Sequence, residues 1–338
     1  MPATPGPIDE VRDLDRHRLA EVLPGWTTPK VIRGLVADWP MVGAARDSAD
    51  AAAAHLKQYD HGTLPVTATT APPAAKGRIF YNADMSGFNF RREQIALKVV
   101  LDTLLKYRST PEPPTIYVAS TTLDSFLPGF RQDNPLALGV DGPLASIWIG
   151  NRSRIAAHHD VPDNLACVAA GRRRVTLFPP DQIGNLYVGP LDFTPAGQAV
   201  SLVDFAEPDL DRFPRFARAM ASAQVAELGP GDAVFIPSLW WHHMEGLDDF
   251  NVLVNYWWRP VPAWMDPPMN ALMLSLLALR GLPPAQRRHW RALFDHYVFS
   301  ADGEANAHIP DSKRGVLGPL DEGMAANVRS VLRKRMER

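Results

Sequence analysis

Proline constrains the fold of this chain more than any other residue. The sequence holds 32 prolines among 338 residues, about twice the 5% that is usual in proteins. They recur through the first 260 positions. A proline ring fixes the backbone angle φ and removes an N–H donor, so it interrupts both helices and central strands. We therefore expect short elements, and no long helix, before residue 260.

Short apolar runs follow one another from about residue 144 and predict β-structure. Turn-forming segments such as Ala170-Gly171 and Gly229-Pro230-Gly231-Asp232 separate them. Regularly spaced short strands favour a sandwich or a barrel. The predicted strands are 144–149, 164–169, 174–178, 233–236 and 251–258.

The two ends of the chain differ from this β region in composition and in the spacing of their apolar residues. Near the amino terminus, residues 29–37 have the apolar density of a short strand and turn, and residues 51–59 have helical composition. Beyond Pro267, apolar residues recur at helical spacing over 269–279, 283–298 and 324–332. We therefore predict a mixed amino-terminal region and a helical carboxyl-terminal region.

Composition excludes several kinds of function. The formal net charge is only −2, so no bulk field draws the protein to nucleic acid or to an anionic membrane. The single cysteine, Cys167, excludes an intrachain disulfide and suits a reducing compartment, so we expect a core residue in a cytoplasmic protein. The first residues lack the features of a secretory signal, and the apolar run 267–279 is shorter than the roughly 20 residues that span a bilayer.

Two segments contain the residues that can bind a metal. His158 and Asp160 are two residues apart, so in an extended segment both side chains project from one face. This match alone is weak, because a chain with 10 histidines is expected to contain about one His-x-Asp by chance. The second segment, 235–243, follows a turn and ends in two tryptophans and two histidines, a pattern that an aromatic core patch also explains.

The combination of the two segments is more informative than either one. A His-x-Asp pair and a later histidine, all on β elements, supply the two imidazoles and one carboxylate that bind Fe(II) in non-haem oxygenases. Three protein ligands leave coordination positions open for a co-substrate and dioxygen, whereas structural zinc sites are closed by four.

The region 150–260 resembles the cupin-like, JmjC-type Fe(II)/2-oxoglutarate-dependent oxygenases, and most closely the subgroup that contains the asparaginyl hydroxylase factor inhibiting HIF. The resemblance is carried by HHDVPDNLACVAAGRRRVTLFPPDQIGNLY, DFAEPDLDRFPRF, GPGDAVFIPSLWWHHMEG and VNYWW, in that order. The segment PKVIRGLVADWP, residues 29–40, resembles the amino-terminal opening of the same family.

The resemblance implies roles for individual residues. His158, Asp160 and His242 fall on the iron ligands, with His242 preferred to His243 because it directly follows the tryptophan pair. Asn164 and Asn255 fall beside the metal and the co-substrate, although both can equally tie down strand ends.

By the same resemblance, Trp257 falls near the substrate mouth, where a core role is an equal alternative.

The sequence departs from the family at the co-substrate. The family holds the distal carboxylate of 2-oxoglutarate with a lysine, a threonine and a tyrosine. Here Arg173 stands for the lysine and Ile155 for the threonine, and Tyr81 is the less certainly aligned tyrosine, following Phe80. Arginine can bind a carboxylate through two parallel hydrogen bonds, but the loss of the threonine hydroxyl removes about 1–2 kcal/mol of binding free energy.

The resemblance implies a mainly β fold, a double-stranded β-helix or jelly-roll cupin barrel. We expect a mixed α/β region at 1–114 packed on the barrel, the barrel at 115–260 and a helical dimerisation region at 261–338. Apolar residues at 269–279, with Trp290, Leu293 and Phe294, suit a self-complementary interface, so we expect a homodimer.

The predicted function is that of a dioxygenase. It would use Fe(II), 2-oxoglutarate and dioxygen to hydroxylate a C–H bond of a protein side chain or a small metabolite, giving succinate and CO2. The alternative is a metal-binding cupin that recognises a ligand without turning over 2-oxoglutarate, an interpretation motivated by Ile155 and Arg173. The sequence does not identify the substrate, because specificity depends on loops such as 185–198.

Overall fold

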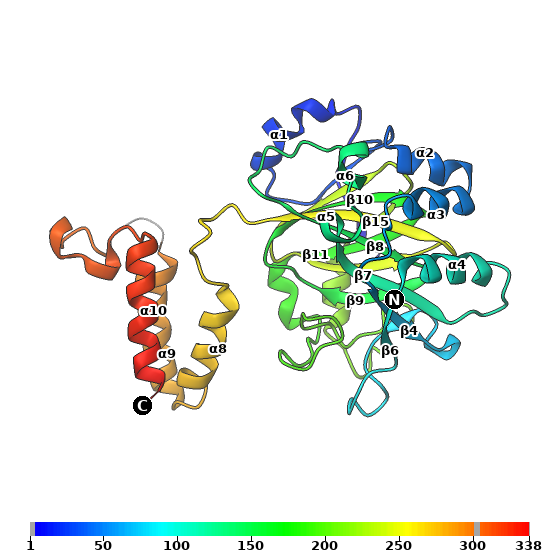
Figure 1. Cartoon of the computed structure of the whole chain (residues 1–338). Coiled ribbons are helices and arrows are strands. Elements are labelled where there is room, and N and C mark those ends of the chain that lie inside the picture. The colour runs from blue at the N-terminus through cyan, green and yellow to red at the C-terminus, as the bar shows by residue number, and fades with distance from the viewer. Residues whose placement is uncertain (1–3, 301–304, 338) are drawn as a thin grey trace. The chain divides into compact units, whose positions relative to one another are not determined.

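Two β-sheets form the body of the unit that ends at Arg259 (Figure 1). The computed structural model describes residues 4–300 and 305–337. Residues 1–3 lie outside the described residues, and the prediction about a secretory signal falls partly on them. A second unit begins at Pro260.

The smaller sheet has six strands and carries the metal-ligand candidates. In spatial order they are β1 (Gly6–Pro7), β12 (Gln224–Leu228), β11 (Arg173–Phe178), β14 (Trp241–Gly246), β9 (Ser153–His158) and β5 (Arg78–Ile79).

The larger sheet has nine strands. In spatial order they are β2 (Glu10–Val11), β3 (Lys30–Ile32), β13 (Ala233–Ile236), β10 (Asp163–Ala170), β15 (Asn251–Trp258), β8 (Leu144–Gly150), β7 (Thr115–Thr122), β4 (Val66–Ala71) and β6 (Arg91–Ile95).

Strand β10 shows how the sequence fills both faces of the larger sheet. Successive strand residues point to opposite faces, so Ala166 and Val168 join one apolar cluster and Leu165 and Cys167 another. The first cluster also contains Val175 of β11, so it fills the space between the two sheets. All four β10 residues are buried, as is typical of a strand covered on both faces. The two packed sheets confirm the predicted jelly-roll.

The helices of this unit are short, as the prolines predict. The longest, α4 (Leu97–Tyr107), has 11 residues, and Ser48 caps α3 by accepting a hydrogen bond from the Ala51 amide. Residues of α2, α3 and α4 share the apolar cluster on the outer face of the larger sheet. The other helices are α1 (Leu19–Val22), α2 (Pro40–Asp47), α3 (Ala49–Lys57), α5 (Leu123–Phe126), α6 (Phe130–Asp133) and α7 (Phe216–Ala221).

The amino-terminal region is more closely joined to the barrel than we expected. Strands β3, β4 and β6 extend the nine-stranded sheet, and β1 and β5 lie at the two edges of the six-stranded sheet. Residue 114 lies at the end of the connection that runs from β6 through α4 to β7, and β7 pairs directly with β4 of the amino-terminal region.

The unit from Pro260 is helical, as predicted. Its main helices are α8 (Pro268–Leu279), α9 (Pro284–Phe294) and α10 (Glu322–Met336), and a π-helical turn, Asp295–Phe299, extends α9. None of these helices contains a buried residue. No helix among residues 4–300 and 305–337 is long and apolar enough to cross a membrane.

Candidate metal centre and adjoining cavity

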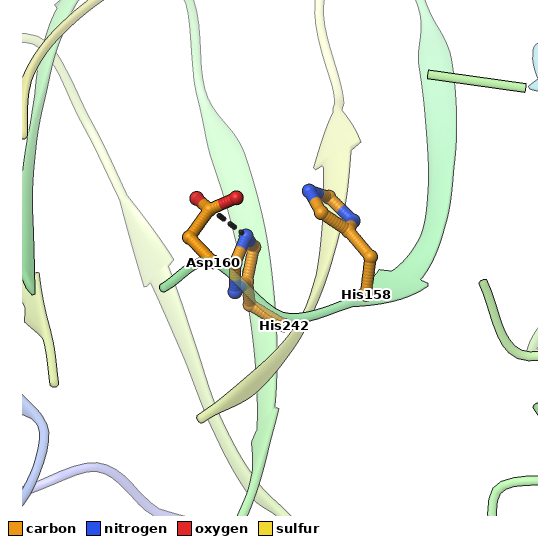
Figure 2. Close-up of side chains that lie close together, drawn as sticks. All are labelled: His158, Asp160 and His242. Carbon is orange, nitrogen blue, oxygen red and sulfur yellow. Dashed lines mark ion pairs between the residues drawn. The ribbon is translucent and has the colours of Figure 1, made fainter. Parts of the chain in front are cut away.

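Strand pairing brings the predicted ligands together. Strands β9 and β14 pair antiparallel in a register that sets His158 directly opposite His242. Their ring centroids are 4.2 Å apart. Asp160 follows β9 by two residues, and one candidate ligand atom from each of the three residues lies within 4.8 Å of the others. Figure 2 shows the three side chains converging on one point.

Backbone carbonyls fix the protonation of both imidazoles. Nδ1 of His158 lies 2.9 Å from the carbonyl oxygen of Ala156, and Nδ1 of His242 lies 3.1 Å from that of Trp240. A carbonyl can only accept, so each Nδ1 carries a proton and Nε2 is the ring nitrogen left to bind a metal. Burial, helped by the neighbouring His158, holds the pKa of His242 well below its ordinary value, so this ring is neutral.

The carboxylate is held from a third strand. The indole N–H of Trp257, on β15, donates to Oδ2 of Asp160 at 3.1 Å. The same oxygen lies 3.6 Å from Nε2 of His242 (dashed line in Figure 2). Two imidazoles and one carboxylate form the donor set that Fe(II) takes in non-haem oxygenases. The residues present therefore fit the predicted metal.

A cavity of about 480 Å³ adjoins these ligands. Part of its wall is apolar and comes from Ile79, Ile155, Val200 and Met244. Seven of the residues predicted from the sequence line it: His158, Asp160, Asn164, Arg173, His242, Asn255 and Trp257.

Arg173 is a buried cation in the cavity wall. Its side chain is only 2% exposed, and its Nε has no hydrogen-bond partner. Burial lowers the pKa of Arg173, and the Tyr117 hydroxyl partly opposes that shift. No ion pair formed by residues 4–300 or 305–337 includes Arg173. A guanidinium keeps its proton even when buried, so the cavity wall offers an unneutralised positive charge.

The arginines on either side of Arg173 face away from the cavity. Arg172 pairs with Asp248 at 2.8 Å, and Arg174 pairs with Glu227 at 2.6 Å. Both pairs are exposed to solvent. Alternation along β11 thus places one arginine inside and two outside.

Two predicted neighbours of the ligands have other partners. The ring of His159 lies edge-on to Trp241 with centroids 4.7 Å apart, and the ring of His243 lies 4.5 Å from that of Phe205. Neither histidine lines the cavity.

The structure places the predicted Tyr81 outside the cavity lining. Its hydroxyl donates to the carbonyl oxygen of Phe193 at 2.5 Å, and its ring contacts Phe80 and Phe88. The tyrosine beside Arg173 is instead Tyr117 on β7, whose pKa burial raises to about 12. Sequence reasoning missed Tyr117 because an apolar alternation marks a strand but does not tell which of its residues meets an arginine 56 positions away.

The cavity also contains a chain of side-chain amides that sequence reasoning found only in part. The indole N–H of Trp148 donates to Oδ1 of Asn255 at 2.7 Å, and Nδ2 of Asn255 donates to Oδ1 of Asn164 at 3.2 Å. Trp148 was not predicted, because nothing in its local sequence distinguishes it from a core tryptophan.

Comparison with known proteins places this architecture in a family. Residues 22–263 match the family described as the cupin-like domain. The chain belongs to the cupin-like domain family, and its relatives are of the JmjC type. This confirms the family expected from the sequence, whereas the asparaginyl hydroxylase subgroup stays a prediction.

Individual relatives of this cupin-like protein match over part of their length. Lysine-specific demethylase JMJ31 of Arabidopsis thaliana is 36% identical over 135 residues, 38% of this chain and 24% of the relative. The tRNA wybutosine-synthesizing protein 5 of Danio rerio is 37% identical over 124 residues, 37% of this chain and 32% of the relative. HSPB1-associated protein 1 of Homo sapiens is 33% identical over 121 residues, 35% of this chain and 24% of the relative. The chain thus spans 24 to 32% of the length of these relatives.

Proposed function

We propose that this cupin-like protein is an Fe(II)- and 2-oxoglutarate-dependent dioxygenase that hydroxylates a C–H bond of a protein side chain or a small metabolite. One observation carries the proposal. A His-Asp-His cluster, in which both imidazoles use Nδ1 on backbone carbonyls, lies on the same cavity as a buried guanidinium that no carboxylate of the described chain neutralises. A metal and a dianionic co-substrate would together use both features.

The arginine is the group that fits 2-oxoglutarate. A buried charge is tolerated when an opposite charge and hydrogen bonds accompany it, and the distal carboxylate would supply both to Arg173. The Tyr117 hydroxyl lies beside Arg173 and can donate a second hydrogen bond. Ile155 also lines the cavity, so one wall beside this carboxylate is apolar where the family has a hydroxyl.

When bound, Fe(II) would activate dioxygen at the expense of 2-oxoglutarate, giving succinate and CO2. The chain's own part is placement and exclusion of water. His158, Asp160 and His242 would supply three ligands to the metal, and the indole of Trp257 keeps the carboxylate in place. The apolar side chains of the cavity wall limit the entry of water beside the reacting C–H bond.

The second candidate function is that of a binding module that holds a metal and a ligand without turnover, and Ile155 is the observation that favours it. The two candidates differ in a binding measurement. A silent module binds its ligand equally well with or without 2-oxoglutarate and iron, whereas an oxygenase binds its substrate in a way that depends on both.

Succinate formation tests the proposal directly. Purified protein is incubated with Fe(II), 2-oxoglutarate and oxygen, and its succinate is compared with that of the His242→Ala variant. We expect slow turnover that disappears in the variant. Absence of turnover together with absence of measurable 2-oxoglutarate binding would refute the oxygenase and favour the binding module.

We also propose that the helical unit from Pro260 associates with a second copy of the chain. None of α8, α9 and α10 has a buried residue, yet the unit exposes many apolar side chains, including Leu277 at 79% and Phe299 at 70%. No residue of this unit at 260–300 or 305–337 is buried, so these residues lack the core that stabilises a domain, and an isologous contact between two copies would provide one. The pattern of Leu and Met along α8 suits such a contact.

A further inference from the structure

Three hydrogen-bonded side chains lie in series on the cavity wall, and one of them determines which atom of each pair donates and which accepts. Trp148, Asn255 and Asn164 lie on the adjacent strands β8, β15 and β10. Asn255 and Asn164 are 1% and 5% exposed, so water does not compete freely for their amides. In such a place the identity of each donor and acceptor matters, because a mismatched pair is costly.

Trp148 is the only member of this chain of three residues that cannot reverse. An indole nitrogen donates and never accepts, whereas an asparagine amide can turn over and exchange its oxygen for its nitrogen. The indole N–H therefore holds Oδ1 of Asn255 toward β8, at 2.7 Å. Asn255 must then present Nδ2 to Asn164, whose Oδ1 accepts at 3.2 Å.

The direction fixed at Trp148 thereby reaches the cavity. Asn164 lines the cavity, and its Oδ1 is already used by Asn255. Its Nδ2 carries two N–H groups, for which the residues at 4–300 and 305–337 supply no hydrogen-bond acceptor. Nδ2 of Asn164 therefore offers hydrogen-bond donors to the same cavity that His158, Asp160 and His242 line.

We propose that Trp148 is a positioning residue that keeps Asn164 as a hydrogen-bond donor to a carboxylate oxygen of the ligand bound at the metal. The inference rests on the proposed function, because it assigns the donor to the acid end of a 2-oxo acid. Without the indole N–H, Asn255 loses its orientation and Asn164 can turn its own oxygen toward the ligand, where two acceptors would repel. Trp148 acts on binding without touching the reacting atoms.

The test is a binding cycle that uses Trp148→Phe, which removes the N–H and keeps an aromatic ring beside Trp257. Affinity for 2-oxoglutarate and for oxalate is measured by calorimetry with Mn(II), a redox-silent metal for this donor set. We expect roughly ten-fold weaker binding of both acids in the variant, since a hydrogen bond to a charged group is lost. In an Asn164→Ala background the same change should alter binding by less than about two-fold, because the residue through which Trp148 acts is gone.

Trp39→Phe is the matched control. Trp39 also donates a buried indole N–H, to the carbonyl oxygen of Pro135 at 3.0 Å, but it does not line the cavity. We expect it to leave acid binding unchanged. Asn255→Leu removes the next hydrogen-bonding group in the same series. It should weaken acid binding as much as Trp148→Phe does, and it is used instead if Trp148→Phe does not fold.

Three outcomes overturn the proposal, and they are distinguishable. Unchanged binding in Trp148→Phe, or an equal loss in both backgrounds, refutes the positioning role and leaves the proposed function intact. If the wild-type protein binds Mn(II) but neither acid, two claims are refuted together. One is that Asn164 donates a hydrogen bond to a bound carboxylate, and the other is that 2-oxoglutarate is the co-substrate.

Discussion

Replacing Arg173 with methionine should make the protein more stable and, at the same time, unable to hold its co-substrate. The side chain is 2% exposed and its Nε has no partner, so the fold bears the cost of removing a charge from water. Methionine fills a similar space without that cost. If Arg173 served only to stabilise the fold, the same substitution would instead make the protein less stable.

The magnitudes follow from the burial. Desolvation of a buried ion costs several kcal/mol, and the Tyr117 hydroxyl loses a neighbour worth about 1–3 kcal/mol, which leaves a net gain of roughly 1–2 kcal/mol in the free energy of unfolding. Removing one partner of a buried charge pair costs about 3–5 kcal/mol, so the dissociation constant of 2-oxoglutarate should rise on the order of 10²- to 10⁴-fold.

The assay combines thermal unfolding of the free protein, in a buffer without carboxylates or phosphate, with calorimetric titration of 2-oxoglutarate in the presence of Mn(II). Arg174→Met is the matched control, since Arg174 lies on the same strand but pairs with Glu227 outside the cavity. It should leave binding unchanged. The reasoning would be refuted if Arg173→Met bound 2-oxoglutarate almost as well as wild type, or if it unfolded at a clearly lower temperature.

Four further predictions concern other parts of the chain. His158→Ala should abolish both iron retention and succinate formation, measured by metal analysis and product assay; full activity would contradict the ligand assignment. Ile155→Thr restores a hydroxyl to the cavity wall and should tighten 2-oxoglutarate binding by about 1–2 kcal/mol in the same calorimetric titration, and weaker binding would argue against an anion at this position. Gly171→Ala should lower the free energy of unfolding by about 2–4 kcal/mol in chemical denaturation, because φ is +68° and the new Cβ would lie 2.4 Å from Oδ1 of Asn251. Gly184→Ala, whose Cβ would have nothing within 4 Å, should cost far less. Light scattering should give twice the chain mass of 37.3 kDa at micromolar concentration, and Leu277→Glu should shift the protein to monomer; a stable wild-type monomer would refute the interface.

The strands that the sequence predicts are the ones whose residues are mostly buried. Strands β8, β10, β11, β13 and β15 are rich in apolar residues, so hydrophobic density marks them, although β11 also carries the exposed Arg174. The edge strand β6 is the opposite case. Its residues Arg91–Gln94 are exposed and polar, so no apolar pattern separates it from a loop.

Strand β9 escapes the same analysis because only half of its residues are buried. The predicted strand 233–236 coincides with β13, but the histidines of the segment 235–243 lie on a second strand. Strand β13 ends at Ile236, and β14 begins at Trp241, after a turn in which Leu239 has a φ of +65°. This turn carries β14 from the larger sheet to the smaller one, where it can pair with β9.

The three candidate metal ligands were predictable from the sequence, as were Asn164, Arg173, Asn255 and Trp257 in the cavity wall, whereas Tyr117 and Trp148 were not. Close spacing and a family motif indicate His158, Asp160 and His242, because these residues recur together for a chemical reason. Tyr117 and Trp148 are defined instead by their partners on other strands, Arg173 and Asn255. Such partners depend on register, which a single sequence does not state.

The doubled histidines at 158–159 and 242–243 carry a risk of misfolding that the fold has to suppress. A slip of one residue in β9 would turn His159 inward and Asp160 outward, and two imidazoles would still face each other. A cluster without its carboxylate would suit zinc or copper better than Fe(II). The contact of His159 with Trp241 favours the observed register of β9, and that of His243 with Phe205 favours the register of β14. These two histidines, which do not line the cavity, thus help to keep Asp160 beside His158 and His242.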